Sequence, residues 1–283
     1  MSGKQEEWKW VINAQTSWLG APVQELVAHK DLLFGLVRKD LLGSYQQTLL
    51  GPLWILVQPI FSVIIYVIVF SRIMGLETAG VPAFLFFLIG ITLWNLFSDL
   101  LIQTSSTITT NVHIFSKVYF PRLISPLSIL VLHYFRFIIH FTLLVGVFIY
   151  FIWMRKVDLV FSRMVLCLIP ILVCSGFAFG IGLVFSVLTA KYRDLAGLLQ
   201  ILLRLFMFIC PVFYSMTTIP VKYRFYIEWN PLAYQFELFR YAFTGHGLIA
   251  FYPIILGIVL MIFTLSVGVL LFNKMTDKLM DVA

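Results

Sequence analysis

The sequence predicts an all-α integral membrane protein with six transmembrane helices, an N-terminal interfacial amphipathic helix and an external re-entrant helical hairpin. The amino-acid composition is the main evidence that this is a membrane protein. Hydrophobic residues make up 61% and charged residues 12% of the 283 residues, whereas soluble domains average about 25% charged residues. The mean hydropathy of +0.97 agrees with this assignment. A chain of this length accommodates about six spans of roughly 20 residues, but no large soluble domain besides.

The N-terminal part, residues 1–52, is expected to remain in the cytoplasm and to carry the interfacial helix. Its first 20 residues include acidic residues and tryptophans but no apolar core before a cleavage site, so a secretory signal is not expected. Apolar residues then recur every four positions from Leu33 to Tyr45, with charged residues between them. This pattern predicts an amphipathic helix over about residues 22–47 that lies in the membrane interface.

The six-span domain covers residues 53–272, and a short charged cytoplasmic tail follows at residues 273–283. Pro59 lacks an N–H inside the first span, so the carbonyl that it frees needs another partner. Gly176 and Gly180 are four apart, which predicts close packing of the fourth span against a neighbour. The predicted spans are residues 53–71, 83–102, 123–152, 164–188, 195–214 and 250–272.

Residues 215–250 have a different pattern, which predicts a re-entrant hairpin on the external side. Pro220 and Pro231 divide this segment into two helical pieces of about ten to fourteen residues, which are too short to cross a bilayer. Aromatic residues crowd both pieces. Lys and Arg are more frequent beside the span ends that lie on the same side as the two termini than beside the external ends. Because positive charge is enriched on the cytoplasmic side, this bias predicts that both termini are cytoplasmic.

Three charged residues fall within the predicted spans: Asp99, Arg136 and Arg204. An arginine at mid-span costs about 2.5–3.5 kcal/mol on insertion scales, so these side chains are expected to face protein, water or phosphate and not lipid tails. The Asp99 carboxylate is expected to face a water-filled interior in preference to extending outward to the membrane surface. His133, Arg136 and His140 share one helix face. For Arg136 the sequence leaves two interpretations open, a structural ion pair with Asp99 and a functional role.

No nucleotide-binding, hydrolytic or metal-binding motif is present, since the sequence lacks GxxxxGK[ST], HExxH and GxSxG. The three cysteines lie in apolar segments and are expected to be small buried hydrophobic side chains. The net charge of +7 is explained by Lys and Arg beside the spans, without nucleic-acid binding. The chain is therefore expected to have no catalytic residues, no metal and no cofactor of its own.

Several short motifs occur in order along the chain: residues 47–54 (QTLLGPLW), 58–59 (QP), 117–122 (KVYFPR), 192–195 (YRDL), 211–214 (PVFY) and 230–231 (NP). Together, over about residues 25–272, they resemble the motifs of permease subunits of polysaccharide-exporting ABC transporters, the O-antigen, capsule and teichoic-acid exporters. One departure is Ser44-Tyr45-Gln46, where members of that family often carry basic residues; Arg38 and Lys39 are the candidates to replace them.

The resemblance implies a homodimer that pairs with two copies of an ATP-binding ABC subunit, which binds the ATP and magnesium. It implies export of a lipid-linked glycan across the bacterial cytoplasmic (inner) membrane. The internal elbow, residues 111–126, would then receive force from the motor, because Phe115 and Tyr119 are four apart and can share one helix face. The expected motor-coupling residues are Val112, Phe115, Lys117, Tyr119, Arg122, Arg38 and Lys39.

Aromatic rings stack on the C–H faces of sugars, and cations bind phosphate. Aromatic residues reach 17% of this chain, although interfacial belts of Tyr and Trp explain a large share of them. The expected substrate path consists of Trp94, Asp99, Tyr134, Arg136, Arg204 and Trp229. Three alternatives remain: an ABC permease for a drug or a lipid, an ion-coupled transporter that uses the intramembrane charges as a proton relay, and a non-transporting membrane scaffold.

Overall fold

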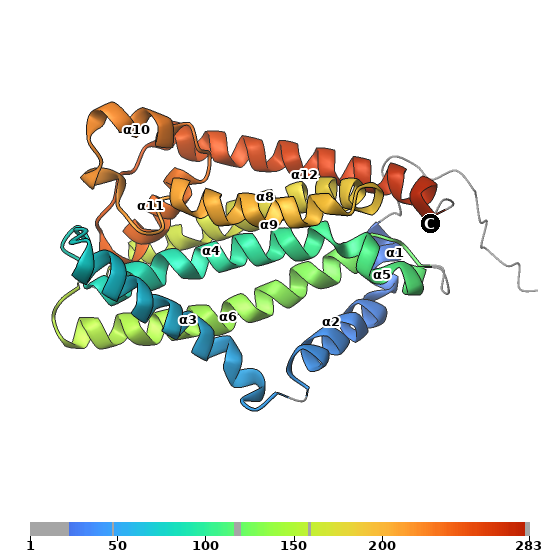
Figure 1. Cartoon of the computed structure of the whole chain (residues 1–283), viewed down its shortest axis with the longest axis horizontal. Coiled ribbons are helices and arrows are strands. Elements are labelled where there is room, and N and C mark those ends of the chain that lie inside the picture. The colour runs from blue at the N-terminus through green and yellow to red at the C-terminus, as the bar shows by residue number, and fades with distance from the viewer. Residues whose placement is uncertain (1–22, 47, 116–119, 158–159, 281–283) are drawn as a thin grey trace, which may run out of the picture.

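The computed structural model describes residues 23–46, 48–115, 120–157 and 160–280, and every regular element in these ranges is helical. The long helices form one bundle, with α10 and α11 at one end and α1, α2 and α5 at the other (Figure 1). The long helices are α3 (Trp54–Tyr66), α4 (Ala83–Ser105), α6 (Ile124–Trp153), α8 (Leu168–Lys191), α9 (Asp194–Ile209) and α12 (Phe251–Met280). The shorter elements are α1 (Val23–Ala28), α2 (Lys30–Tyr45), η1 (Gly51–Leu53), η2 (Val67–Ile73), α5 (Thr107–Phe115), α7 (Phe161–Met164), η3 (Val165–Cys167), η4 (Met216–Thr218), α10 (Val221–Glu228) and α11 (Ala233–Thr244).

Five stretches in the described ranges are long and apolar enough to cross a membrane, and they coincide with five of the predicted spans. The remaining predicted span, residues 195–214, is helical only to Ile209, because Cys210 is extended and Pro211 follows it. With 16 residues, α9 is about 24 Å long, shorter than the hydrocarbon core. The five candidate spans are Gly51–Ile73, Ala83–Ser105, Ile124–Trp153, Phe161–Lys191 and Phe251–Met275.

Helix α4 is the centre of the bundle and packs against α3, α6, α8 and α9. Its side chains are buried on nearly every side, and Phe86, Phe87 and Phe97 are almost fully enclosed. By contrast, α3 and α12 expose large apolar side chains such as Phe61 and Phe263. A helix that is apolar on all faces is stable in lipid, so these exposed surfaces fit the hydrocarbon core of a membrane.

Glycines bring α8 into close contact with two neighbours, as their spacing predicted. A Cβ at Gly180 would lie 2.6 Å from the backbone nitrogen of Leu265 in α12, and Gly268 of α12 lies against the backbone of Gly180. On the adjoining face, a Cβ at Gly182 would lie 2.7 Å from Cβ of Thr104 in α4. The absence of a side chain at these positions therefore permits the close packing of α4, α8 and α12.

We expect Gly180→Ala to lower the stability of the chain by about 1–3 kcal/mol, since the added methyl group collides with backbone atoms that cannot move aside. The same change at Gly146 in α6 is the matched control, because a Cβ there meets nothing within 4 Å. Thermal unfolding of both variants in one detergent measures the difference. Equal midpoints for the two variants would contradict this account of the α8–α12 contact.

The first span contains Pro59 within α3 and ends in the π-helical element η2. Because proline has no N–H, it frees the carbonyl four residues earlier, which belongs to Ile55. In α6, Nε2–H of His140 donates to that carbonyl at 2.9 Å. One member of the predicted polar face of α6 thus satisfies the backbone group that Pro59 leaves free.

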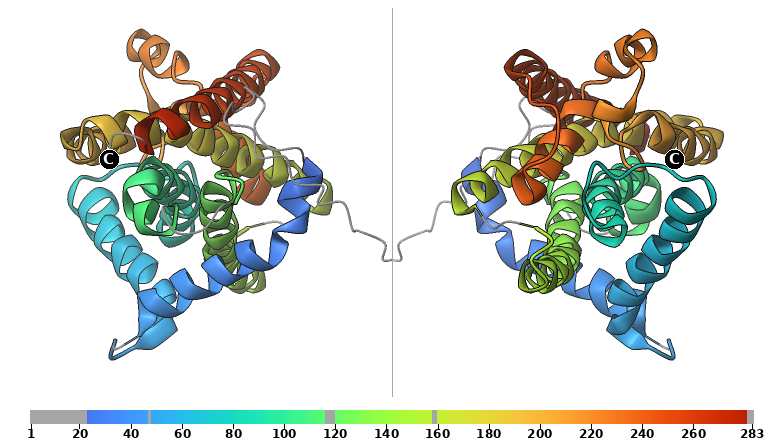
Figure 2. Two further views of the ribbon diagram at one scale, coloured as in Figure 1. Left: turned by 90° about the vertical axis from the view of Figure 1, so that its right-hand side faces the viewer. Right: turned by 90° about the vertical axis from the view of Figure 1, so that its left-hand side faces the viewer.

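The N-terminal helical segment is interrupted at His29, which separates α1 from α2. Seen down the bundle, α2 and α3 form a V beside α4 and α6 (Figure 2). Helix α2 packs on α6 and buries Leu36 and Val37, so its apolar face is partly covered by protein. The predicted segment 215–250 contains two short helices, α10 of 8 residues and α11 of 12 residues. Tyr223 of α10 and Trp229, which follows this helix, are exposed, whereas most aromatic side chains of α11 are buried in the bundle.

Candidate functional site

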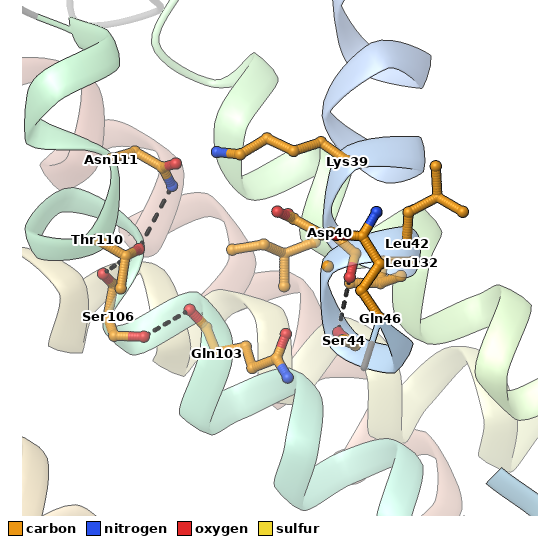
Figure 3. Close-up of a pocket in the computed structure, with 12 residues that line it drawn as sticks. Lys39, Asp40, Leu42, Ser44, Gln46, Gln103, Ser106, Thr110, Asn111 and Leu132 are labelled. Carbon is orange, nitrogen blue, oxygen red and sulfur yellow. Dashed lines mark hydrogen bonds between the residues drawn. The ribbon is translucent and has the colours of Figure 1, made fainter. Parts of the chain in front are cut away.

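The structure contains a cavity of about 730 Å³ between α2, α4, α5 and α6 (Figure 3). It lies where α4 ends and α6 begins, at the α5 end of the bundle. Eight of its twelve lining residues carry a polar side chain, although they belong to a strongly apolar chain. The lining residues are Lys39, Asp40, Leu42, Gly43, Ser44 and Gln46 of the α2 segment, Gln103 and Ser106 at the end of α4, Thr110 and Asn111 of α5, and Ile129 and Leu132 of α6.

The wall formed by α4 and α5 offers hydrogen-bond acceptors. Oγ1 of Thr110 donates to the carbonyl of Ser106 at 2.9 Å, and Oγ of Ser106 donates to the carbonyl of Gln103 at 3.1 Å. A hydroxyl that donates to the backbone keeps its lone pairs for another partner. Asn111 is fixed by Nδ2, which donates to Oγ of Ser125 at 2.9 Å and thereby joins α5 to α6.

The opposite wall, formed by α2, carries charge. Lys39 is exposed, and its side chain extends from α2 toward Asn111 across the cavity (Figure 3). The carboxylate of Asp40 is half-buried and points into the same space. Oγ of Ser44 donates to the Asp40 carbonyl at 2.6 Å and accepts from Nη2 of Arg136 at 3.0 Å. The Arg136 guanidinium therefore lies directly behind this wall.

Arg136 contacts α2, so the ion pair with Asp99, one of the two interpretations of its role, is not formed in the described residues. Besides Ser44, it lies over the ring of Tyr45 at 5.9 Å, and in the described ranges no ion pair joins it to Asp99. Asp99 is exposed on α4 and accepts a 3.4 Å hydrogen bond from Ser98. Asn95, Asp99 and Gln103 are four residues apart along α4, so they form one polar stripe that reaches the cavity.

A second, smaller cavity of about 170 Å³ lies between α4 and α9. It joins two residues of the predicted path, Trp94 and Arg204. Arg204 and Gln200 are exposed on α9 among apolar side chains such as Ile201 and Leu205. Its lining residues are Trp94, Ser98 and Ile102 of α4, and Gln200, Leu203, Arg204 and Met207 of α9.

The remaining residues of the predicted path have other surroundings. The Tyr134 hydroxyl shares a 2.6 Å hydrogen bond with Oγ of Ser175, which links α6 to α8. Trp229 follows α10 and is 75% exposed. The predicted path is thus divided among five places. They are the small cavity with Trp94 and Arg204, the α4 stripe with Asp99, the α2–α6 contact with Arg136, the α6–α8 contact with Tyr134, and the exposed Trp229 after α10.

Four of the seven predicted motor-coupling residues lie in α2 and α5, which are at the same end of the bundle (Figure 1). Val112 and Phe115 belong to the last turns of α5, whereas Lys117 and Tyr119 lie outside the described residues. Arg122 is half-buried just before α6. Arg38 and Lys39 are both exposed on α2, and Lys39 also lines the large cavity.

One buried ion pair was not anticipated from the sequence. In α11, Nη1 of Arg240 donates to Oε1 of Glu237 at 2.6 Å, and both side chains are at most 1% exposed. Nη2 donates to the carbonyl of Pro211 at 2.6 Å, and the guanidinium lies 4.0 Å from the centre of the Phe86 ring. Burial lowers the pKa of Arg240, while the Glu237 carboxylate raises it. The i, i+3 spacing of an acid and a base in α11 was the available signal.

The comparison with known families decides the classification. The family model described as "ABC-2 type transporter" matches residues 31–244. The chain belongs to the ABC-2 type transporter family. The matched region runs from α2 through α11 and contains every residue that lines either cavity. This ABC-2 protein is therefore a multi-pass membrane protein of a family of transport permeases.

Its relatives in this family share sequence over most of their length. An O-antigen export system permease protein, RfbA, of Klebsiella pneumoniae is 29% identical over 255 residues, which cover 89% of this chain and 95% of the relative. RfbA of Myxococcus xanthus is 27% identical over 197 residues, covering 70% and 73%. The polysialic acid transport protein KpsM of Escherichia coli is 28% identical over 201 residues, covering 68% and 73%.

Proposed function

We propose that this chain is the membrane-spanning permease subunit of an ATP-driven exporter that moves a lipid-linked polysaccharide across the bacterial inner membrane. The observation that carries the proposal is the near full-length similarity to a permease named for O-antigen export. Membership of the ABC-2 family favours ATP-driven transport over an ion-coupled mechanism or a scaffold. An ABC permease for a drug or another lipid is the second candidate.

The ATPase is a separate subunit in this proposal. The sequence contains no GxxxxGK[ST] motif, so two copies of a partner would bind ATP and magnesium. Helix α5 is the proposed contact with that partner. Its attachments support this role, because Asn111 joins it to α6 and the Thr189 hydroxyl of α8 donates at 2.5 Å to the Ser105 carbonyl just before it. A displacement of α5 would reach three long helices.

A six-span topology with both termini in the cytoplasm agrees with the course of the chain. Helix α9 returns from the α5 end of the bundle to the end that holds α10 and α11, and α12 then runs back (Figure 1). Because α2 and the end of α12 lie at the same end, the number of crossings is even. In this proposal α9 and the residues that follow it make the sixth crossing, and α10 and α11 form the external re-entrant region.

A homodimer would cover the polar face of α9. An exposed arginine within the hydrocarbon core costs about 2.5–3.5 kcal/mol, and Arg204 and Gln200 lie on a face that this chain leaves uncovered. A second copy, or water between two copies, would remove that cost. The small cavity with Trp94 would then open onto a path between the two permeases, where an aromatic ring can stack on passing sugars.

Deletion of the gene should remove the exported glycan from the cell surface and leave lipid-linked polymer inside, and the intact chain should restore export. Immunoblotting of surface and intracellular glycan measures both. Complementation with Trp94→Ala should restore export only weakly, whereas Trp153→Ala, a change at a side chain 81% exposed at the end of α6, should restore it fully. If surface glycan is unchanged by the deletion while a drug or lipid accumulates, the second candidate replaces this proposal.

A further inference from the structure

The large cavity has a composition suited to one kind of ligand. None of its twelve lining residues is aromatic, and eight carry a charge, a hydroxyl or a side-chain amide. Planar carboxamides and carboxylates can bind two neighbouring hydroxyl groups at once, as Asp40 and Gln103 are placed to do. The hydroxyls of Ser106 and Thr110 add acceptors, because their own protons go to the backbone. Such a surface complements the hydroxyl groups of sugars.

The cavity also supplies positive charge at its rim. Lys39 extends into it with an ammonium group that can donate to phosphate oxygens. Arg136 lies behind Ser44 and is held there by a 3.0 Å hydrogen bond, so it adds positive potential without entering the space. Leu42, Ile129 and Leu132 provide an apolar patch beside these polar groups. The cavity thus offers a cation for a phosphate, polar side chains for sugar hydroxyls and an apolar patch for a lipid chain.

We propose that the large cavity binds the glycosyl phosphate head of the lipid-linked substrate and is its loading site before the glycan enters the bundle. This inference rests on the proposed function. The volume of about 730 Å³ is in the range of small-ligand sites and accommodates a few sugar units, but not a polymer. The stripe of Asn95, Asp99 and Gln103 continues from the cavity along α4 and gives the sugar hydroxyls polar partners deeper in the bundle.

The position of α2 adds to the argument. This helix has an amphipathic pattern typical of the membrane interface, the level at which a lipid carrier holds its phosphate. Since α2 forms one whole wall of the cavity, the phosphate could reach Lys39 while its lipid chain remains among the acyl chains. In this position the sugar would lie against the polar wall, the phosphate beside Lys39 and the lipid chain in the membrane.

The test is binding of a defined probe, farnesyl diphosphate carrying a hexose disaccharide, to the purified full-length chain in nanodiscs. We expect Lys39→Gln to weaken binding by about ten- to a hundredfold, the loss typical of a charge-assisted hydrogen bond. Thr110→Val should weaken it by about two- to tenfold, as for a neutral hydrogen bond. Lys30→Gln and Thr109→Val are matched controls on the same helices, because neither residue lines the cavity, and both should bind the probe as the unchanged chain does.

Two competitors separate the possible ligands. Farnesyl diphosphate without sugar should bind at least about tenfold more weakly, if several neutral hydrogen bonds to hydroxyls contribute. Phosphatidylglycerol should not displace the probe; displacement at similar concentrations would assign the cavity to a phospholipid head group and overturn the proposal. Unchanged binding in both lining variants would mean a water-filled recess and overturn it as well. In that case the deletion phenotype would still stand, so failure of the loading site and failure of the export function are distinguishable.

Discussion

Replacement of Glu237 by alanine is expected to lower the free energy of unfolding by about 3–5 kcal/mol, because it leaves the buried Arg240 guanidinium without its counter-charge. The carboxylate has further roles: it accepts from the backbone nitrogen of Met216 at 2.9 Å and from that of Leu248 at 3.2 Å. These contacts tie both segments that flank α11 to one side chain. The region from η4 to the start of α12 should therefore loosen as a unit.

Chemical unfolding in detergent, monitored by tryptophan fluorescence, measures this loss. Glu77→Ala is the control, since this glutamate is exposed in the connection between η2 and α4. The double change to Glu237→Met and Arg240→Met should be less damaging than Glu237→Ala alone, because it removes both charges and keeps the volume. A single variant as stable as the control would show that the pair does not hold α11 in place.

Truncation of Phe115 to alanine is expected to reduce export at least about tenfold while the chain still inserts and folds. An aromatic anchor at a protein interface typically contributes about 2–4 kcal/mol, which corresponds to a loss of this size or larger. Phe115 is the last residue of α5, the helix through which we propose that the partner ATPase acts. The partner should continue to hydrolyse ATP in the reconstituted complex, because only the transmission of force is impaired.

Surface glycan and ATP hydrolysis, measured side by side, test this uncoupling. Phe263→Ala makes the same chemical change on the outward face of α12, where the ring is 63% exposed, and should leave export intact. Export at the normal level in the Phe115 variant would make α5 a simple connection between α4 and α6. Loss of export together with loss of the protein from the membrane would assign the effect to folding instead.

Much of the fold was predictable, because apolar runs of about 20 residues have few stable alternatives in lipid. Pro59 and the glycines of α8 also acted locally, as their chemistry requires, so their effects were foreseen. The end of α9 was misplaced by five residues, since the predicted span continued through Cys210 and Pro211 to Tyr214. The extended backbone at Cys210 is a local effect of the following Pro211, which hydropathy alone does not encode.

The candidate site was less predictable, because it depends on contacts between distant segments. The sequence correctly marked Arg136 as a residue that faces protein or water, but its partner Ser44 is 92 positions away. Trp94 and Arg204 were both selected, and only the packing of α9 on α4 brings them to one cavity. Asp40, Gln103 and Thr110 were missed since single polar residues near helix ends are ordinary, and the cavity exists only through their combination.

The glycine contacts among α4, α8 and α12 hold these three helices more tightly together than the rest of the bundle. Because these backbones are in direct contact, with no flexible side chains between them, we expect the three helices to move as one unit. Widening for a passing polymer then has to occur on the other flank, formed by α2, α3 and α9. That flank contains the proline in α3 and the π-helical turns of η2, both of which are common sites of helix bending. We therefore expect α4, α8 and α12 to stay in place during transport, while α2, α3 and α9 move outward. The moving flank includes α2, which forms one wall of the large cavity.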